Sequence, residues 1–139
     1  MVPETDRAYI AGLFDGEGTV GFYKRYETKK DRKGKPRKSL CNRISVEIAM
    51  TERSVLLWMY ELLKIGSVTK KPRKKHKMQW RWRCSFRQAY YFCCLIYPYC
   101  HIKIHKVQKI IDHYSSRKSL KFNGKVVSLE EYKEAMSLE

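Results

Sequence analysis

The sequence lacks the features that mark a secreted or membrane-bound protein. No apolar run is long enough to span a bilayer, and the start, Met-Val-Pro-Glu-Thr-Asp, is not that of a signal peptide. The five cysteines are odd in number and form no CxxC pair. We therefore expect buried free thiols in a reducing intracellular compartment, either bacterial or phage-infected cytoplasm or an organelle (chloroplast or mitochondrion). A zinc site of Cys100, His101 and His105 stays open as an alternative, although its spacing fits no common site.

Acidic residues are also scarce, and their scarcity is uneven along the chain. There are 30 Lys and Arg against 14 Asp and Glu, for a net charge of +16. Lys24–Lys38 and Val68–Arg87 together hold 18 of the bases and 2 of the acids, which leaves 12 of each elsewhere. Because the whole net charge comes from two segments, it indicates a polyanion-binding face rather than diffuse surface charge.

The hydrophobic pattern predicts one α+β domain over residues 1–139, with a core at about 1–115 and a C-terminal loop and helix at 116–139. The expected helices lie at about 5–17, 52–63, 87–97, 104–116 and from Ser128 onward. The expected strands lie at about 19–30, 40–50, 67–74 and 78–86. Two hairpins, each with one apolar and one basic face, predict a four-stranded antiparallel sheet backed by helices.

Several local features sharpen this expectation. Thr51 is placed to cap the second helix, and Ser85-Phe-Arg-Gln88 reads as a capping box that opens the third. In the last strand of the sheet, the alternation assigns Trp80, Trp82, Cys84 and Phe86 to the core. On the second helix, the expected buried side is Val55, Leu56, Trp58, Met59, Leu62 and Leu63.

The first helix carries unusual residues. Ala8, Gly12 and Gly16 form a stripe almost without side chains, although each glycine costs a helix roughly 1 kcal/mol, which suggests close backbone approach to something. Asp15 and Glu17 stand at its C-terminal end, where a carboxylate opposes the helix dipole by about 0.3–1 kcal/mol. Acids at this end suggest a bound cation. The alternative is an ordinary amphipathic helix with a glycine stop and solvated acids.

Residues Ile10-Ala-Gly-Leu-Phe-Asp-Gly-Glu-Gly18 resemble, at all nine positions and with conservative changes, the motif that names the LAGLIDADG homing endonucleases. The resemblance implies an αββαββα core with a saddle-shaped sheet, plus C-terminal helices. It also implies an intron-encoded enzyme that cuts double-stranded DNA at a long, near-palindromic site with Mg²⁺, for which Mn²⁺ or Ca²⁺ can substitute in binding. Because the chain holds no second copy of the motif, it implies a homodimer whose interface includes Ala8, Gly12, Leu13, Asp15 and Gly16.

The resemblance further implies roles for individual residues. The metal-binding acid falls on Glu17, where most members carry Asp, and Gly16 would offer its backbone carbonyl as a further ligand. Glu52 matches a catalytic polar residue after the second strand, although it could merely be an acid at a helix N-terminus. Lys103, just past Pro98, matches a basic residue that stabilises charge near the scissile phosphate, and the alternative there is a solvated surface lysine.

The two hairpins fit duplex DNA. A strand rises about 3.3 Å per residue, close to the roughly 3.4 Å per nucleotide of DNA, so a ribbon of about ten residues can follow about ten base pairs in the major groove. The major groove of an RNA helix is too narrow for such a ribbon. Two roles are open for Glu27 and Glu47 on this basic face. Each either contacts a DNA base or simply pairs with a neighbouring Lys or Arg of the protein. The predicted DNA-contacting residues are Tyr23, Arg25, Glu27, Lys29, Arg43, Ser45, Glu47, Thr69, Lys71, Arg73, Gln79, Arg81 and Arg83.

Two other classes of protein stay open. One is a protein of the same fold without nuclease activity, which binds DNA or acts as an intron RNA maturase. The other is a basic structural RNA-binding protein, which accounts for the charge but not for the acids at the helix end. For this protein we expect no membrane partner and no small-molecule cofactor.

Overall fold

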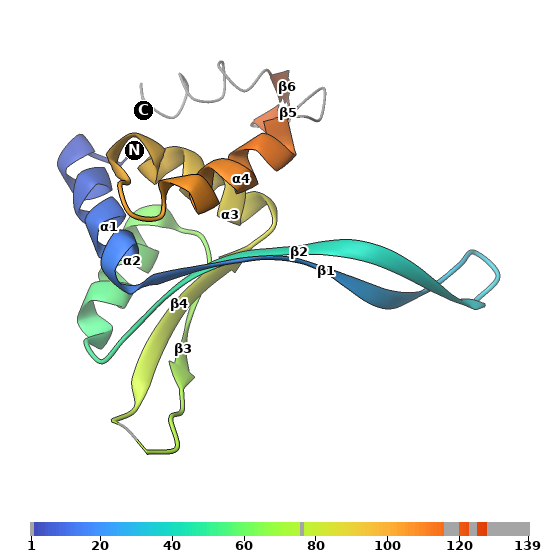
Figure 1. The fold of residues 1–139 in the computed structure, drawn as a ribbon, viewed down its shortest axis with the longest axis horizontal. Coiled ribbons are helices and arrows are strands. Elements are labelled where there is room, and N and C mark those ends of the chain that lie inside the picture. The colour runs from blue at the N-terminus through green and yellow to red at the C-terminus, as the bar shows by residue number, and fades with distance from the viewer. Residues whose placement is uncertain (1, 76, 116–119, 123–124, 128–139) are drawn as a thin grey trace.

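The structure, a computed structural model, describes residues 2–75, 77–115, 120–122 and 125–127 (Figure 1). Within this part of the chain the predicted order of helix, hairpin, helix, hairpin and helix is confirmed. The helix expected from Ser128 lies outside the described residues. In chain order the elements are α1 (Glu4–Glu17), β1 (Gly18–Lys30), β2 (Pro36–Met50), α2 (Arg53–Leu63), β3 (Ser67–Lys71), β4 (Gln79–Ser85), α3 (Arg87–Ile96), a 3₁₀ turn (Tyr97–Tyr99), α4 (Ile104–Ser115), β5 (Leu120–Phe122) and β6 (Lys125–Val127).

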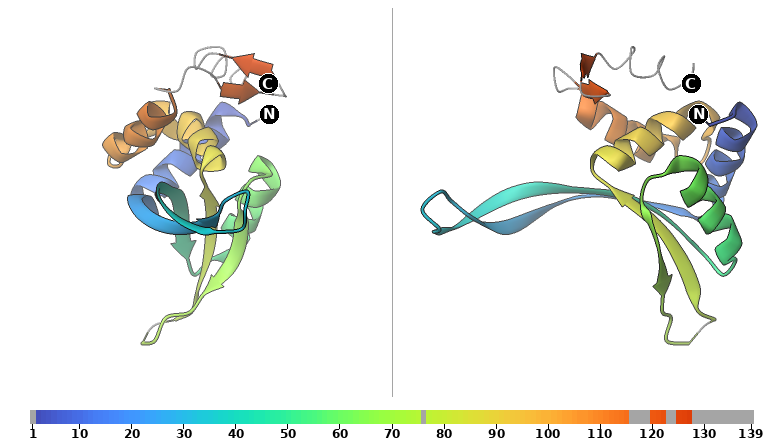
Figure 2. Two further views of the ribbon diagram at one scale, coloured as in Figure 1. Left: turned by 90° about the vertical axis from the view of Figure 1, so that its right-hand side faces the viewer. Right: turned by 180° about the vertical axis from the view of Figure 1, so that it is seen from behind.

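The sheet is antiparallel throughout, in the order β1-β2-β4-β3. β1 and β2 pair along their length, from Gly18 opposite Ile48 to Lys30 opposite Pro36. β4 joins only the inner end of β2, between Ser45 and Met50. The outer part of the β1–β2 hairpin is therefore a two-stranded arm that projects from the body, while the β3–β4 hairpin points in a different direction (Figures 1 and 2).

The helices cover one face of the sheet and bury its apolar side chains. On β2, Ile44, Val46 and Ile48 are buried as the alternation predicts. Phe92 of α3 packs between sheet and helix, with its ring centroid 4.8 Å from that of Trp82 and 5.3 Å from that of Phe14. Within the part of the chain that the structure describes, no helix covers the other face of the sheet (Figure 2).

α1 passes into β1 without a loop, and Gly18 is the residue that allows it. Gly18 is buried with an extended backbone (φ −85°), and its N–H donates to the carbonyl of Phe14. A Cβ at this position would collide with the ring and the carbonyl oxygen of Phe14. The glycine therefore fixes the end of α1, with Glu17, at the root of the β1–β2 hairpin.

Three helix starts differ from the sequence prediction. α1 begins at Glu4, behind Pro3, rather than at Thr5 or Asp6. α2 is preceded by Glu52 as its N-cap residue, so Thr51 lies one residue too early to cap it. α3 follows Phe86, and the predicted capping box does not form, because Gln88 instead accepts a hydrogen bond (3.2 Å) from the backbone N–H of Gly66.

Two aromatic side chains expected in the core are exposed. Trp58 is 37% exposed and packs edge-to-face on Tyr9 across the α1–α2 boundary, with ring centroids 5.6 Å apart. Phe86 is 42% exposed because it leaves the strand alternation at a positive φ of 54°. Residues 120–122 and 125–127, expected to lie in a loop, instead form the short antiparallel pair β5 and β6.

Replacing Gly18 with alanine should lower the free energy of unfolding by about 1–3 kcal/mol, because the added methyl group overpacks against Phe14. Thr5→Ala, at an exposed position of the same helix away from the stripe, is the control. Urea unfolding followed by circular dichroism measures both. Equal stability of the two variants would contradict the tight junction.

Candidate catalytic centre and nucleic-acid interface

The predicted DNA-contacting residues of the four strands share one face of the sheet. Tyr23 lies opposite Arg43 in the β1–β2 register, and Glu47 of β2 lies opposite Arg83 of β4. On the far side of β4, Lys71 lies opposite Gln79. Because side chains alternate between faces, this register puts every predicted strand residue on the side away from the helices. Arg73 lies just beyond the end of β3 and is exposed.

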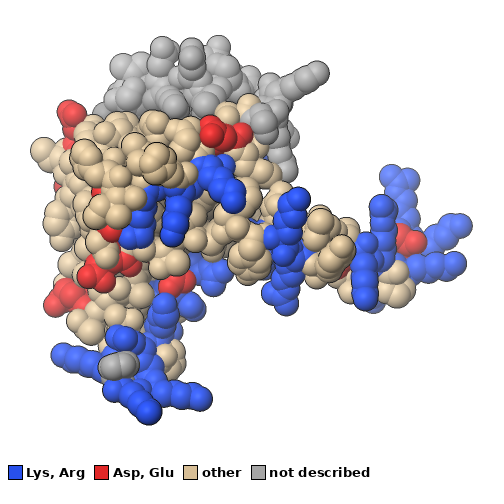
Figure 3. Space-filling model, in the orientation of Figure 1, with Lys and Arg blue, Asp and Glu red and all other residues tan. Residues whose placement is uncertain are grey.

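The basic residues extend to the tips of both hairpins. Figure 3 shows Lys and Arg crowded at the end of the β1–β2 arm and at the end of the β3–β4 hairpin, with most of the visible acids on the α1–α2 side of the body. The two hairpins that carry the net charge thus border the helix-free face of the sheet. This separation of charge suits a long polyanion laid along the hairpins.

The two acids on this face are paired with bases of the same chain. Glu27 accepts a hydrogen bond from Arg43 at 2.8 Å. Glu47 lies 2.9 Å from Lys71 and 4.0 Å from Arg81. The sequence left two roles open for Glu27 and Glu47, contact with DNA bases or pairing with basic residues of the protein. The structure contains the second. Such half-exposed pairs contribute about 0–1 kcal/mol each, so their effect lies more in side-chain position than in stability.

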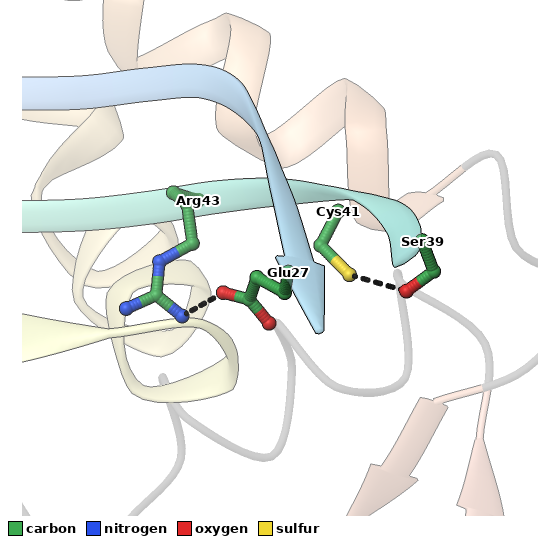
Figure 4. Close-up of polar contacts among 4 residues, drawn as sticks. All are labelled: Glu27, Ser39, Cys41 and Arg43. Carbon is green, nitrogen blue, oxygen red and sulfur yellow. Dashed lines mark hydrogen bonds and ion pairs between the residues drawn. The ribbon is translucent and has the colours of Figure 1, made fainter. Parts of the chain in front are cut away.

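Further polar groups of this face escaped the sequence analysis. Figure 4 shows Ser39 and Cys41 beside the Glu27–Arg43 pair, with the Ser39 hydroxyl 3.5 Å from the Cys41 sulfur. Side chains two residues apart on a strand share a face, so the alternation along β2 could have placed Ser39 and Cys41 on the same face as Arg43. The Nε atom of Arg81 is buried and has no hydrogen-bond partner within the described part of the chain.

At the root of the hairpins, Asp15 connects α1 to the segment before α4. Its two carboxylate oxygens accept the backbone N–H groups of His101 (2.8 Å) and Lys103 (3.1 Å). Burial alone would raise the pKa of the Asp15 carboxyl. The backbone N–H groups of residues 101 to 103 more than offset that effect and hold the pKa below its ordinary value of 3.8. Asp15, expected at the dimer interface, is therefore turned into its own chain and is only 8% exposed.

The same connection brings Lys103 to the end of the motif helix. The Lys103 Nζ donates to the backbone carbonyl of Asp15 at 2.6 Å. A cation suits this position, because the last carbonyls of a helix carry partial negative charge. Lys103 and the motif acid Glu17, 86 positions apart in sequence, therefore both stand at the C-terminal end of α1.

The two remaining acids predicted for the site are exposed. Glu17 is the last residue of α1, and its carboxylate has no hydrogen bond or ion pair to any described residue. Glu52 lies between β2 and α2, and its carboxylate accepts the hydroxyl of Ser54 at 2.7 Å. Because Gly18 pairs with Ile48, the end of α1 lies beside the end of β2, from which Glu52 follows shortly.

One chain does not complete a metal site by itself. Among the described residues, no three His, Cys, Asp or Glu side chains gather closely enough to hold an ion, which leaves the zinc alternative unsupported. Burial raises the pKa of the Cys100 thiol to about 12, which also disfavours the thiolate that zinc requires. The donors at the end of α1 are the Glu17 carboxylate and the Gly16 carbonyl, and such hard oxygen ligands fit Mg²⁺ or Ca²⁺.

The stripe along α1 is open to the outside. Ala8, Gly12 and Gly16 are exposed, and a methyl group added at either glycine would meet no atom within 4 Å. Leu13, beside the stripe, is half-buried. A second helix could approach this face closely.

Known structures resemble this chain, whereas no protein-family model and no curated protein matches its sequence. The homing endonuclease I-CvuI in complex with a DNA target, in the presence of Mg, superposes with a TM-score of 0.59 at 16% identity, over 78% of this chain and 65% of that chain. An archaeal intron-encoded homing endonuclease complexed with DNA gives 0.57 at 16% identity, over 78% and 66%. The LAGLIDADG homing endonuclease I-GzeII in complex with its DNA target gives 0.54 at 14% identity, over 85% and 39%.

At these identities the likeness is one of fold. The chain has the α+β fold of the LAGLIDADG homing endonucleases, with the four-stranded antiparallel sheet that the sequence predicts. It spans about two thirds of the length of the first two structures. The nonapeptide occupies the last two turns of α1 and the first residue of β1.

Asp15→Asn should lower the free energy of unfolding by about 1.5–3 kcal/mol near neutral pH, because one hydrogen bond to a charged acceptor is lost. A depressed pKa in the folded state stabilises the protein above the ordinary carboxyl pKa. The stabilisation is lost as pH falls through the folded value, so the difference between wild type and variant should shrink below 3.8. Urea unfolding at a series of pH values measures it, and a difference that does not depend on pH would contradict the prediction.

Proposed function

We propose that this protein is a homodimeric, site-specific DNA endonuclease that depends on a divalent metal and cleaves both strands of a long, near-palindromic site. The observation that carries the proposal is at the end of α1. There the exposed Glu17 carboxylate and the Lys103 amine, which binds the Asp15 carbonyl, belong to the same helix end at the root of two basic hairpins.

Double-stranded DNA is the proposed substrate for two reasons. The helix-free face of the sheet carries the basic residues, and its β1–β2 hairpin, with strands of 13 and 15 residues, is long enough to follow about ten base pairs, or about twenty in a dimer. In addition, the solved structures of the same fold include complexes of homing endonucleases with DNA. These observations favour DNA over the structured RNA of a maturase.

In the proposed mechanism Glu17 and the Gly16 carbonyl would hold the metal, and the chemistry that the metal would supply is activation of a water and stabilisation of the leaving oxygen. Two I-CvuI complexes with DNA, one in the presence of 2 mM Mg with the DNA not cleaved and one in the presence of 2 mM Ca, are consistent with the choice of a divalent ion. The Lys103 ammonium has three N–H donors, one of which binds the Asp15 carbonyl. The others are available for the phosphate, whose growing negative charge the ammonium would stabilise. Glu52 would orient water at the edge of the same centre.

Two protomers are proposed because one chain supplies a single such end, whereas a double-strand break needs two hydrolytic centres. The open stripe of Ala8, Gly12 and Gly16 lies on the same helix as Glu17. Packing of two α1 helices through this stripe about a twofold axis would bring both Glu17 carboxylates to the axis and set the two sheets in line. We also propose that the protein acts in a reducing compartment, as its five free cysteines suggest.

Glu17→Gln should abolish cleavage while preserving DNA binding, because the amide keeps the shape but loses the charge that holds the metal. Cleavage with Mg²⁺ and binding without it are measured on DNA selected from a randomised pool. Glu61→Gln, at an exposed acid on α2, is the control and should cut normally. Metal-dependent nicking that survives in the Glu17 variant would refute the assignment, and binding to structured RNA alone would favour the maturase.

Gly12→Leu should convert the dimer into a monomer of 16.6 kDa, because the side chain blocks close approach to the α1 stripe while meeting nothing in its own chain. Sedimentation equilibrium measures the mass. Asp112→Leu, on an exposed position of α4, is the control and should stay dimeric. A wild-type protein that is monomeric at micromolar concentration, with or without DNA, would contradict the proposed assembly.

A further inference from the structure

Phe86 has a backbone conformation that a bulky residue rarely adopts. It is the single residue between β4 and α3, with φ 54° and ψ −123°, and its N–H donates to the carbonyl of Ile44 at 2.9 Å. Glycine takes such a conformation without strain, whereas a side chain makes it costly. Strained backbone of this kind gathers at functional sites, so the presence of phenylalanine here calls for a reason beyond the turn itself.

The ring of Phe86 lies against Arg43. The guanidinium carbon of Arg43 is 5.3 Å from the ring centroid, within the range of a cation–π contact. On β1, Glu27 accepts a hydrogen bond from Nη1 of the same guanidinium at 2.8 Å (Figure 4). Arg43 is thus held by residues that flank β2 on both sides, one from β1 and one from the end of β4.

This arrangement leaves Arg43 available to a ligand. Its side chain is still 38% exposed, and it points to the face of the sheet that carries the other basic residues. A guanidinium has five N–H donors, of which the structure assigns one to Glu27. A bidentate contact to the O6 and N7 acceptors of guanine needs two, in a fixed plane.

We infer that Glu27, Arg43 and Phe86 form a guanine-reading unit, in which Arg43 contacts the base and the other two are positioning residues. The inference rests on the proposed function, since it names the base that one part of the DNA face selects. It also gives Glu27 a role that pure electrostatics would not. An acid on a basic face weakens phosphate binding, but here it orients the arginine before DNA arrives.

Holding Arg43 in advance has a physical advantage for specificity. A free arginine side chain samples many rotamers and can contact many acceptors. When its plane is fixed by a carboxylate and an aromatic ring, only a base edge that presents two acceptors in the matching position is satisfied. The competing explanation is that the three residues merely brace the β1–β2 arm against the body.

The test is a selection of bound sequences from a DNA pool with randomised positions, with divalent metal omitted so that binding is read without cleavage. The wild-type protein should select guanine at one symmetric pair of positions. Arg43→Gln should reduce that preference roughly 5- to 150-fold and leave the other positions unchanged. Glu27→Gln should reduce it at the same positions.

Phe86 is tested with variants that separate the ring from the backbone. Phe86→Gly removes the ring but suits the backbone, so a weaker guanine preference cannot come from added strain. Phe86→Tyr keeps the ring and should keep the preference. Tyr26→Leu is the control, because Tyr26 is an exposed aromatic (71%) on the opposite face of the same ribbon.

The outcomes are distinct. Loss of guanine preference at one symmetric pair in the Arg43, Glu27 and Phe86→Gly proteins supports the unit. An unchanged selected site, with a lower unfolding temperature in the same variants, overturns it and leaves a structural brace. A wild-type protein that selects no DNA sequence at all would overturn the proposed function and this inference together.

Discussion

The carboxylate of Asp15 is the contact on which the candidate centre depends. It joins the end of α1 to the segment before α4 through two backbone N–H groups, across 86 and 88 positions of sequence. Two other polar contacts join this part of the chain to α1: the Lys103 amine donates to the Asp15 carbonyl, and the Tyr99 hydroxyl donates to Glu4 at the start of the helix. Because the Asp15 carboxylate is charged and mostly buried, its hydrogen bonds are stronger than ordinary amide pairs. One acid of the motif thus places the Lys103 ammonium at the end of the helix that also carries the other acid.

The helix geometry explains how two acids can stand so close at the wrong end of a helix. Residues two apart on an α-helix point about 200° away from each other. Asp15 therefore turns inward to the α4 segment, while Glu17 turns outward, and the two carboxylates do not share one environment. The dipole penalty at Asp15 is offset by hydrogen bonds, and Lys103 supplies a cation at the same helix end. Glu17 retains a charge that nothing in the described chain neutralises.

The fold was accessible to sequence reasoning because its signals are local. The alternation of Ile44, Val46 and Ile48 identifies a strand by itself, and the nine residues of the motif locate the helix end where Glu17 lies. The partners of Asp15 were not accessible, since a backbone N–H has no sequence signature and the contact spans much of the chain.

The position of Phe86 was missed for a related reason. Strict alternation places it in the core with Trp82 and Cys84, and only the abrupt turn from β4 into α3 reverses it. The same turn makes the capping box at Ser85 fail, because the N-cap position moves on by one residue. A hydrophobic pattern with the period of a strand or of a helix mispredicts burial where two elements meet without a loop. Such junctions occur here and at Gly18. These junctions are also where the candidate functional residues lie.

The glycine stripe of α1 and the Glu17 carboxylate at its end belong to one rigid helix. In the proposed enzyme, the way two chains assemble therefore determines where the two catalytic centres lie. Ile10 and Phe14 anchor the helix in the core, so its orientation relative to the sheet is fixed. Gly12 and Gly16 then mark a side of α1 from which a second helix can come within backbone distance, because neither position carries a side chain that would keep it away. Any partner that packs there sets the separation of the two Glu17 carboxylates and the angle between the two sheets at once. A substitution in the stripe would therefore alter the spacing of the two cuts and the length of DNA spanned together, and it could not change one alone.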